Sequence, residues 1–211
     1  MRKTLTEFIG TFFLVLTIGL TVLGGTPFAP LAIGAALMVM VYMGGHTSGG
    51  HYNPAVSLAV MLRGKLATKD LLPYMLAQLA GALAAALVTR AITGHTFAPA
   101  PADSASPLAA LLVELLFTFA LALMVLNTAT SSRTQGNSYY GLAIGFTVTV
   151  GAFAGGPISG GAFNPAVGVG PTIVDALLGD GTFGHLWLYL LGPLLGGVLA
   201  ALVFRIQERE D

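Results

Sequence analysis

The chain has 211 residues, of which 55% are hydrophobic and only 9% are charged, and its formal net charge is zero. Soluble domains carry about 25% charged residues, so this composition excludes an ordinary water-soluble protein and indicates that the solvent is lipid. The zero net charge argues against a nucleic-acid partner, and the lack of cysteine excludes disulfides and thiolate metal sites.

Six apolar stretches have the length of a membrane span, which is about 20 residues for a hydrocarbon core of about 30 Å. Only a helix satisfies every backbone group in such a segment, so we predict an all-α membrane protein. The run after Met1-Arg2-Lys3 is longer than the core of a signal peptide and lacks a clear cleavage site, so we interpret it as the first span. The predicted spans are residues 4–24, 30–46, 70–93, 106–128, 138–156 and 183–205.

A nine-residue motif occurs twice. Residues 48–56 read Ser-Gly-Gly-His-Tyr-Asn-Pro-Ala-Val, residues 159–167 read Ser-Gly-Gly-Ala-Phe-Asn-Pro-Ala-Val, and seven of the nine are identical. Each motif leads into a short apolar piece, 53–62 and 164–175, that is too short to span the bilayer. Matching short segments in two halves indicate broken helices that meet at membrane depth.

The halves also match at their first spans, where Glu7-x3-Thr11-Phe12 is echoed by Glu114-x3-Thr118-Phe119. Three spans per half is an odd number, so the second half must enter the membrane from the opposite side. We therefore predict a single transmembrane domain over 1–211, built from inverted repeats at about 1–95 and 106–211 with a linker at about 96–105.

The basic residues predict the orientation. If the N-terminus is cytoplasmic, only Arg90 falls on the opposite side, and by the positive-inside rule we expect a multi-pass protein of the cell membrane with both termini in the cytoplasm. The basic residues on the cytoplasmic side are Arg2, Lys3, Arg63, Lys65, Lys69, Arg133, Arg205 and Arg209.

Each Asn-Pro-Ala triplet has the features of a helix start. Proline suits the first helical position, and the preceding asparagine is a favoured N-cap. A helix N-terminus carries about half a positive charge, so two facing ends would repel cations and hydronium while the asparagine amides donate to neutral solutes. The predicted pore motifs are Asn53, Pro54, Ala55, Asn164, Pro165 and Ala166.

The residues before each asparagine are poor helix formers. If they are extended, their carbonyls form a ladder of acceptors, and irregular backbone at membrane depth is tolerated where it lines a cavity. The predicted pore carbonyls belong to Gly49, Gly50, His51, Gly160 and Ala162, and we expect His51 to line the cytoplasmic half of the pore.

The segment order, the paired Glu-x3-Thr-Phe openings and the two Asn-Pro-Ala boxes closely resemble the aquaporin, or major intrinsic protein, family. Ala77-Gln78-x2-Gly81 and Gly192-Pro193-x2-Gly196 are also similar to it. The resemblance implies a bundle of six spanning helices plus two half-helices, usually a homotetramer with a pore in each subunit. It further implies that Glu7 and Glu114 brace the loops by accepting backbone N–H bonds. A proton relay through these carboxylates is the other interpretation of ionisable groups inside spans.

The resemblance also implies a narrow filter beside the asparagine pair, which in the family typically holds an aromatic residue, often a histidine, a small residue and an arginine. The corresponding positions here are Ile33, Ala152, Gly161 and Val167, where Ile33 and Ala152 are assigned within one residue. This filter lacks the arginine, so we expect it to be wide and apolar. It would pass water and small neutral solutes such as glycerol, urea or undissociated metalloid hydroxides.

A proton- or ion-coupled transporter is the alternative, because inverted repeats with broken helices occur there too. No ionisable residue except His51 adjoins the asparagine pair, and no cage of carboxylates for a coupling ion is visible. An enzyme is not expected, because the sequence contains no nucleophile–base pair, metal set or cofactor motif. We therefore predict a passive channel without a cofactor or a bound metal.

Overall fold

The computed structural model describes residues 1–208, and Arg209 of the charge count above lies outside this range. All regular structure in the described residues is helical, and six helices are long and apolar enough to cross a membrane. Their ends lie within three residues of the predicted spans, so the predicted all-α membrane fold is confirmed. The long helices are α1 (Arg2–Leu23), α2 (Ala29–Ser48), α4 (Thr68–Thr93), α5 (Pro107–Val125), α6 (Tyr140–Ser159) and α8 (Leu186–Gln207).

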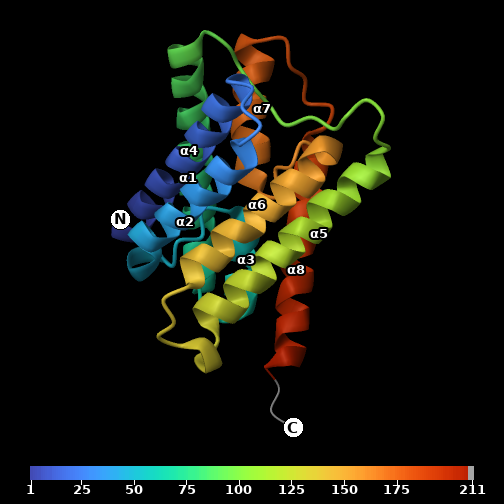
Figure 1. Ribbon diagram of the computed structural model, residues 1–211. Helices are drawn as coiled ribbons and strands as arrows, with labels where there is room; N and C mark the ends of the chain where they lie inside the picture. Colours follow the sequence, from blue (N-terminus) through green and yellow to red (C-terminus); the bar gives the residue numbers. More distant parts are fainter. Residues whose placement is uncertain (209–211) are drawn as a thin grey trace.

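Two shorter helices, α3 (Pro54–Leu62) and α7 (Pro165–Leu178), begin at the prolines of the repeated motif. Proline is pre-organised for this first position, where its missing N–H costs nothing. In Figure 1, α7 lies in the upper part of the molecule and α3 in the lower part. Each short helix packs against the last long helix of the other half, α3 on α8 and α7 on α4, so the two halves interlock.

The long helices pack in the same way in both halves. Helix α1 contacts α2 and α4, just as α5 contacts α6 and α8, while α2 and α6 join the halves. Glycines allow the closest approaches, because a Cβ on Gly81 of α4 would lie 2.5 Å from the Phe8 carbonyl oxygen of α1. A Cβ on Gly196 of α8 would lie 2.5 Å from the Leu115 oxygen of α5. Small residues let helices in lipid touch along their backbones, and both halves use them at the same place.

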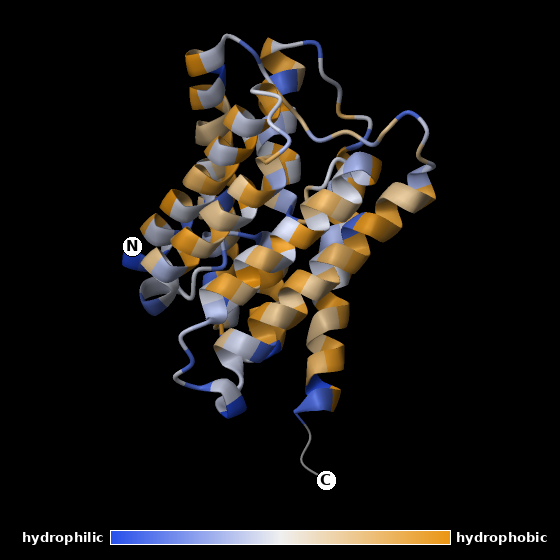
Figure 2. Ribbon diagram, viewed as in Figure 1, coloured by the Kyte–Doolittle hydropathy of each residue, from blue (hydrophilic) through white to orange (hydrophobic). Residues whose placement is uncertain are grey.

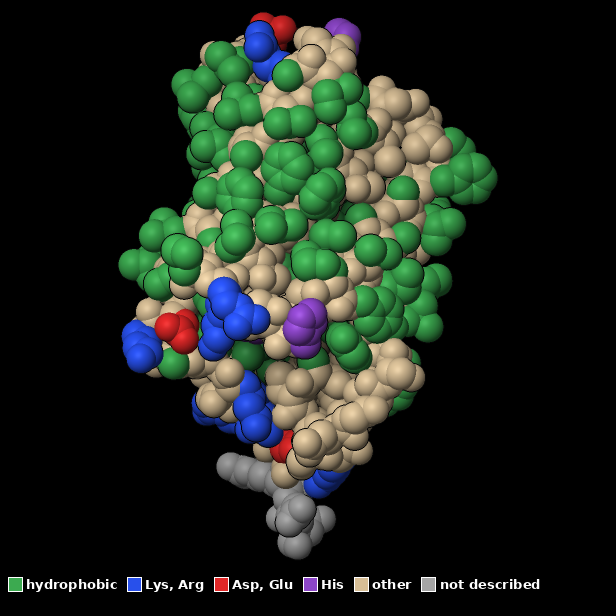
Figure 3. Space-filling view, turned by 90° about the vertical axis from the view of Figure 1, so that its left-hand side faces the viewer, with side chains coloured by type: hydrophobic (Ala, Val, Ile, Leu, Met, Phe, Trp, Pro, Cys, Tyr) green, Lys and Arg blue, Asp and Glu red, His purple; other side chains and the backbone are tan. Residues whose placement is uncertain are grey.

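The outer surface has the polarity of a membrane protein. The outward faces of the long helices are mainly hydrophobic, and hydrophilic residues gather at helix ends and loops (Figure 2). On the face in Figure 3, hydrophobic side chains cover the upper and middle parts, while most Lys and Arg side chains lie in the lower part. Large apolar side chains such as Leu72 and Ile92 are more than half exposed, as expected where the neighbour is lipid.

Candidate functional site at the meeting point of the two short helices

The loops that lead into α3 and α7 have the same backbone conformation. The φ angles of Gly50 and Gly161 are +64° and +65°, and those of Tyr52 and Phe163 are both +50°. Residues with side chains seldom adopt positive φ, and they do so where surrounding contacts hold them there. In both loops this conformation occurs directly before the asparagine, so the repeated sequence folds into a repeated loop.

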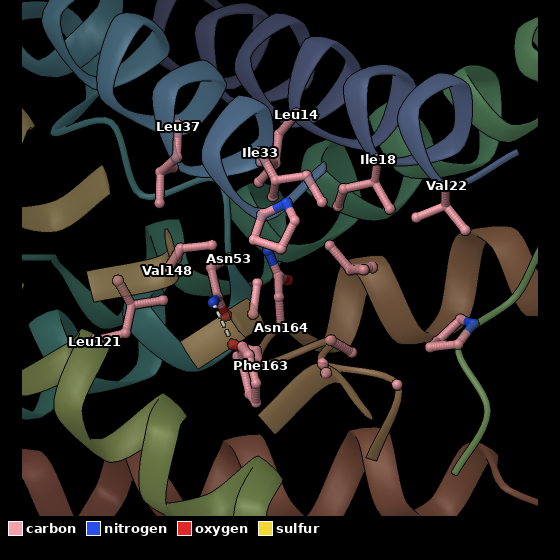
Figure 4. A pocket seen from close by; sticks show the side chains of 18 of the residues that line it. Leu14, Ile18, Val22, Ile33, Leu37, Asn53, Leu121, Val148, Phe163 and Asn164 are labelled. Atoms are coloured by element: carbon pink, nitrogen blue, oxygen red, sulfur yellow. Dashed lines mark hydrogen bonds between the residues drawn. The ribbon is translucent and has the colours of Figure 1, made fainter. Parts of the chain in front are cut away.

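The two asparagines tie the loops together. The Nδ2 atom of Asn53 donates to the Phe163 carbonyl oxygen at 2.9 Å (Figure 4), and Nδ2 of Asn164 donates to the Tyr52 carbonyl oxygen at 2.9 Å. Each Oδ1 atom caps its own helix, by accepting from Ala55 N in one half and from Ala166 N in the other. Since an amide has two hydrogens and one is used in the cross-bond, each Nδ2 retains one N–H for a further acceptor.

Two buried carboxylates hold the loops. Glu7 of α1 and Glu114 of α5 are both 0% exposed. Every described partner of these carboxylates can donate a hydrogen, so the oxygens act as acceptors for the loop backbone, and charge-assisted bonds of this kind are among the stronger ones in proteins. Glu7 accepts from Ser48 Oγ, His51 N, Tyr52 N and Gln78 Nε2, and Glu114 accepts from Ser159 Oγ, Ala162 N and Phe163 N.

A cavity of about 480 Å³ lies beside the asparagine pair. Figure 4 shows side chains of α1, α2, α5 and α6 converging on the space next to Asn53 and Asn164. All four residues that the sequence assigns to the filter, Ile33, Ala152, Gly161 and Val167, line this one cavity. The fold therefore brings together positions that are more than 130 residues apart in the chain.

The lining is almost entirely uncharged and apolar. Among the described residues that form it, only Asn53, Asn164 and His51 have polar side chains. Gly160 and Ala162 also contribute, whereas Gly49 and Gly50, expected to offer carbonyls, do not line this cavity. The remaining motif residues are buried behind the asparagines, where they pack rather than face the cavity: Pro54, Ala55, Pro165 and Ala166.

The linker between α4 and α5 forms part of the cavity wall, which the sequence did not indicate. Residues 97–100 line the cavity, and Phe97 is only 9% exposed. Two hydrogen bonds hold this segment: Thr96 Oγ1 donates to Asp175 Oδ1 of α7 at 2.6 Å, and Ala102 N donates to the Ile158 carbonyl at 3.1 Å. The Pro- and Ala-rich composition predicts an irregular linker but carries no signal for where it docks.

This arrangement favours neutral molecules. The positive ends of α3 and α7 converge at the asparagine pair, so a cation in the cavity meets two helix dipoles and finds no carboxylate in the lining. The two free amide hydrogens offer bonds to a solute oxygen. An all-helical membrane fold with two half-helices meeting beside an uncharged cavity defines a channel for small neutral solutes.

Comparison with known proteins agrees with this class. The family model described as major intrinsic protein matches residues 1–204. Aquaporin NIP1-1 of Zea mays is 36% identical, with 98% of this chain and 74% of the relative covered. Glycerol uptake facilitator protein-like 6 of Lactiplantibacillus plantarum is 35% identical, with 100% of both chains covered. The X-ray structure of the aquaglyceroporin from Plasmodium falciparum superposes with a TM-score of 0.86 at 24% identity, over 96% of this chain and 94% of that one.

The chain therefore belongs to the major intrinsic protein family, as its resemblance implied. It is a multi-pass membrane protein and a passive channel for water and small neutral solutes, and it is not an enzyme. The coupled transporter considered from the sequence is not favoured.

Proposed function

We propose that this channel conducts neutral solutes larger than water, in addition to water itself, through a filter formed by Ile33, Ala152, Gly161 and Val167. The observation that carries the proposal is that these four residues line one cavity of about 480 Å³ and contribute no charged or hydrogen-bonding side chain to it. Val167 occupies the position after the second Asn-Pro-Ala, where the family typically has an arginine, and it contributes only an apolar side chain to the cavity wall.

A solute that enters the filter exchanges its hydrogen bonds to water for contacts with the filter wall. An apolar wall offers water no replacement for the hydrogen bonds it gives up. A solute with both a carbon skeleton and hydroxyl or amide groups contacts the wall with one part and the amides of Asn53 and Asn164 with the other. Glycerol and urea have this chemistry, and undissociated metalloid hydroxides share the hydroxyl groups. The name of the relative from Lactiplantibacillus plantarum, a glycerol uptake facilitator protein-like protein, supports a solute of this size.

Ion exclusion in this proposal depends on the central asparagine pair. Without a fixed cation in the filter, the helix ends at Asn53 and Asn164 are the main barrier to cations. Glu7 and Glu114 serve as braces, because their hydrogen bonds to loop N–H groups leave them engaged rather than free to relay protons. The carbonyls of Gly160, Ala162 and His51 supply acceptors along the path, and those of Gly49 and Gly50 would extend the row beyond the cavity.

The architecture we propose has inverted repeats at about 1–95 and 106–211 joined by a linker at about 96–105. We further propose a homotetramer in the cell membrane with both termini cytoplasmic. The matched packing of the two halves supports the inverted repeats, and the concentration of Lys and Arg in one part of the surface supports the orientation (Figure 3). Native mass spectrometry of the detergent-solubilised protein tests the oligomer, and protease access to a terminal tag in sealed vesicles tests the orientation.

Stopped-flow light scattering on proteoliposomes tests the solute class. Water, glycerol and urea fluxes are compared between the wild type and Val167→Arg, which adds a charge and bulk inside the filter. We expect glycerol flux to fall several-fold more than water flux. Leu178→Arg is the matched control, because it adds the same side chain on α7 at a position 46% exposed and outside this cavity. An equal loss of every solute in Val167→Arg contradicts the filter assignment, and a flux driven by a proton gradient favours the coupled transporter.

A further inference from the structure

The two halves differ in one buried polar network. In the first half, His51 Nδ1 lies 3.1 Å from Ser57 Oγ, and Gln78 Nε2 lies 2.9 Å from the same oxygen. In the second half, the repeated motif places Ala162 and Gly168 at the positions of His51 and Ser57. Tyr74 and Tyr189 make matching bonds to Ser48 and Ser159 carbonyls, and four residues further on Gln78 is matched by Pro193. The first half alone therefore has this network.

The carboxylate of Glu7 determines how the Gln78 amide is oriented. Gln78 Nε2 lies 2.8 Å from Glu7 Oε2, and since the loop N–H groups also point at this carboxylate, the amide must present its nitrogen to it. The same nitrogen lies 2.9 Å from Ser57 Oγ. Both amide hydrogens are thus donated, one to Glu7 and one to Ser57.

The Ser57 hydroxyl then has only one acceptor left for its own hydrogen. Ser57 is 0% exposed, and the His51 ring is the remaining polar group within hydrogen-bond distance of its Oγ among the described residues. If Nδ1 carried a hydrogen and donated to Ser57, the serine O–H would be buried without an acceptor, which costs about 1–3 kcal/mol. Ser57 therefore donates to His51 Nδ1, and the neutral ring carries its hydrogen on Nε2.

The other ring nitrogen has no protein hydrogen-bond partner among the described residues. His51 lines the cavity, and its Nε2 atom lies on the side of the ring next to Gly49. We propose that Ser57 and Gln78 are positioning residues that lock His51 in the Nε2–H tautomer, so that the imidazole offers a fixed N–H donor to solutes in the cavity that His51 lines. The functional consequence depends on the proposed function, because it requires this cavity to be the solute path.

A locked donor acts in a specific way on the contents of the cavity. The Nε2–H group binds a solute oxygen, as the free amide hydrogens of Asn53 and Asn164 do, so the path has a third donor on one side of the pair only. A nitrogen that already carries its hydrogen cannot take a proton from a hydrogen-bonded water. His51 is therefore a contact for neutral solutes and not a step in a proton relay.

The test is solid-state NMR of the full-length protein in liposomes, with ¹⁵N-labelled histidine. His51→Gln identifies the His51 signals by their loss. In the wild type we expect one neutral form, with Nδ1 unprotonated and Nε2 protonated. In Ser57→Ala, which removes the donor to Nδ1, we expect both tautomers to be populated. Ser48→Ala is the control, because it removes a hydroxyl that is bound to Glu7 rather than to His51 and leaves the Ser57–His51 contact in place. We expect its His51 signals to match the wild type.

Several outcomes would overturn the proposal. A wild-type ring protonated on Nδ1 contradicts it without the need for any variant to fold. A pure Nε2–H form in Ser57→Ala, or an equal tautomer change in Ser48→Ala, shows that Ser57 does not set the tautomer. The spectrum does not depend on which solutes permeate, so a channel that conducts water alone would contradict the proposed function while leaving the tautomer lock intact.

Discussion

The ring of Tyr52 occupies the space that the missing side chain of Gly10 leaves on α1. A Cβ at Gly10 would overlap the ring, and the Tyr52 hydroxyl beyond it donates to the Met40 carbonyl of α2 at 2.8 Å. Tyr52 is 0% exposed and supplies the carbonyl that binds Asn164. The absence of a side chain on one helix thus determines where the loop of the first half can sit.

Substitution Gly10→Ala is expected to displace Tyr52 and with it the carbonyl that binds Asn164. Overpacking of a closely packed site costs about 1–3 kcal/mol, so we expect a lower apparent melting temperature in detergent and reduced water flux in proteoliposomes. Gly45→Ala is the control, because its new Cβ would meet its nearest neighbour at 3.4 Å, an ordinary contact. Equal stability of the two variants would show that the loop tolerates the displacement.

Substitution Glu114→Gln replaces one acceptor oxygen by an NH2 group that faces loop donors. Ala162 N and Phe163 N both donate to this carboxylate, so one buried N–H loses its partner at a cost of about 1–3 kcal/mol. We expect a lower apparent melting temperature and a large loss of water flux. Asp103→Asn, at an exposed linker carboxylate, is the control for a lost negative charge. Unchanged flux in Glu114→Gln would argue against a bracing role.

Substitution Asn53→Asp removes the Nδ2 donor and places carboxylate oxygen against the Phe163 carbonyl oxygen. The repulsion breaks the cross-bond between the loops, and the new negative charge offsets the positive helix ends that exclude cations. We expect reduced water flux together with an increased cation leak, measured with a pH-sensitive dye and with a sodium-sensitive dye in proteoliposomes. Gln135→Glu adds the same charge in an exposed loop and is expected to leave both fluxes unchanged. A cation leak equal to that of the wild type would contradict the role assigned to the helix ends.

Substitution Thr96→Val deletes the hydroxyl that bonds Asp175 while keeping the shape of the side chain. A hydrogen bond to a charged group is worth about 1.5–3 kcal/mol, so the linker is expected to open more often. Hydrogen–deuterium exchange at the Ala102 amide, which bonds the Ile158 carbonyl, reports this opening and is expected to become faster. Thr182→Val, at an exposed threonine, is the control. Unchanged exchange at Ala102 would mean that the linker is held mainly by Phe97.

The sequence predicts the helices well because the backbone groups of each span must form their hydrogen bonds within the helix in lipid. Length and hydrophobicity are therefore sufficient to identify a span. It also predicts the pairing of Asn53 with Asn164, because the motif is repeated in full. The filter positions Ile33 and Ala152 required a count over 20 and 12 residues from the motifs, and the structure places both in the cavity wall.

Other parts of the site depend on contacts that no local pattern encodes. The docking of Phe97 depends on the shape of a surface made by α1 and α4, and the bond between Thr96 and Asp175 joins residues 79 positions apart. In the sequence Ser57 is an ordinary small residue of a short helix, and only the structure shows that Gln78 lies within hydrogen-bond distance of it. In the sequence Gln78 is only part of a motif similar to the family, and its partners Glu7 and Ser57 could only be identified in three dimensions.

The cross-bonds of Asn53 and Asn164 have a consequence for assembly. Each half supplies the acceptor that the other half's amide needs, so neither half alone can complete the hydrogen bonds at the meeting point of the two short helices. If the second half inserts with the wrong topology, these amide and carbonyl groups lie in the hydrocarbon core without hydrogen-bond partners. Burying an unpaired polar group there costs free energy. The same four groups that join the two short helices therefore also depend on correct insertion of both halves.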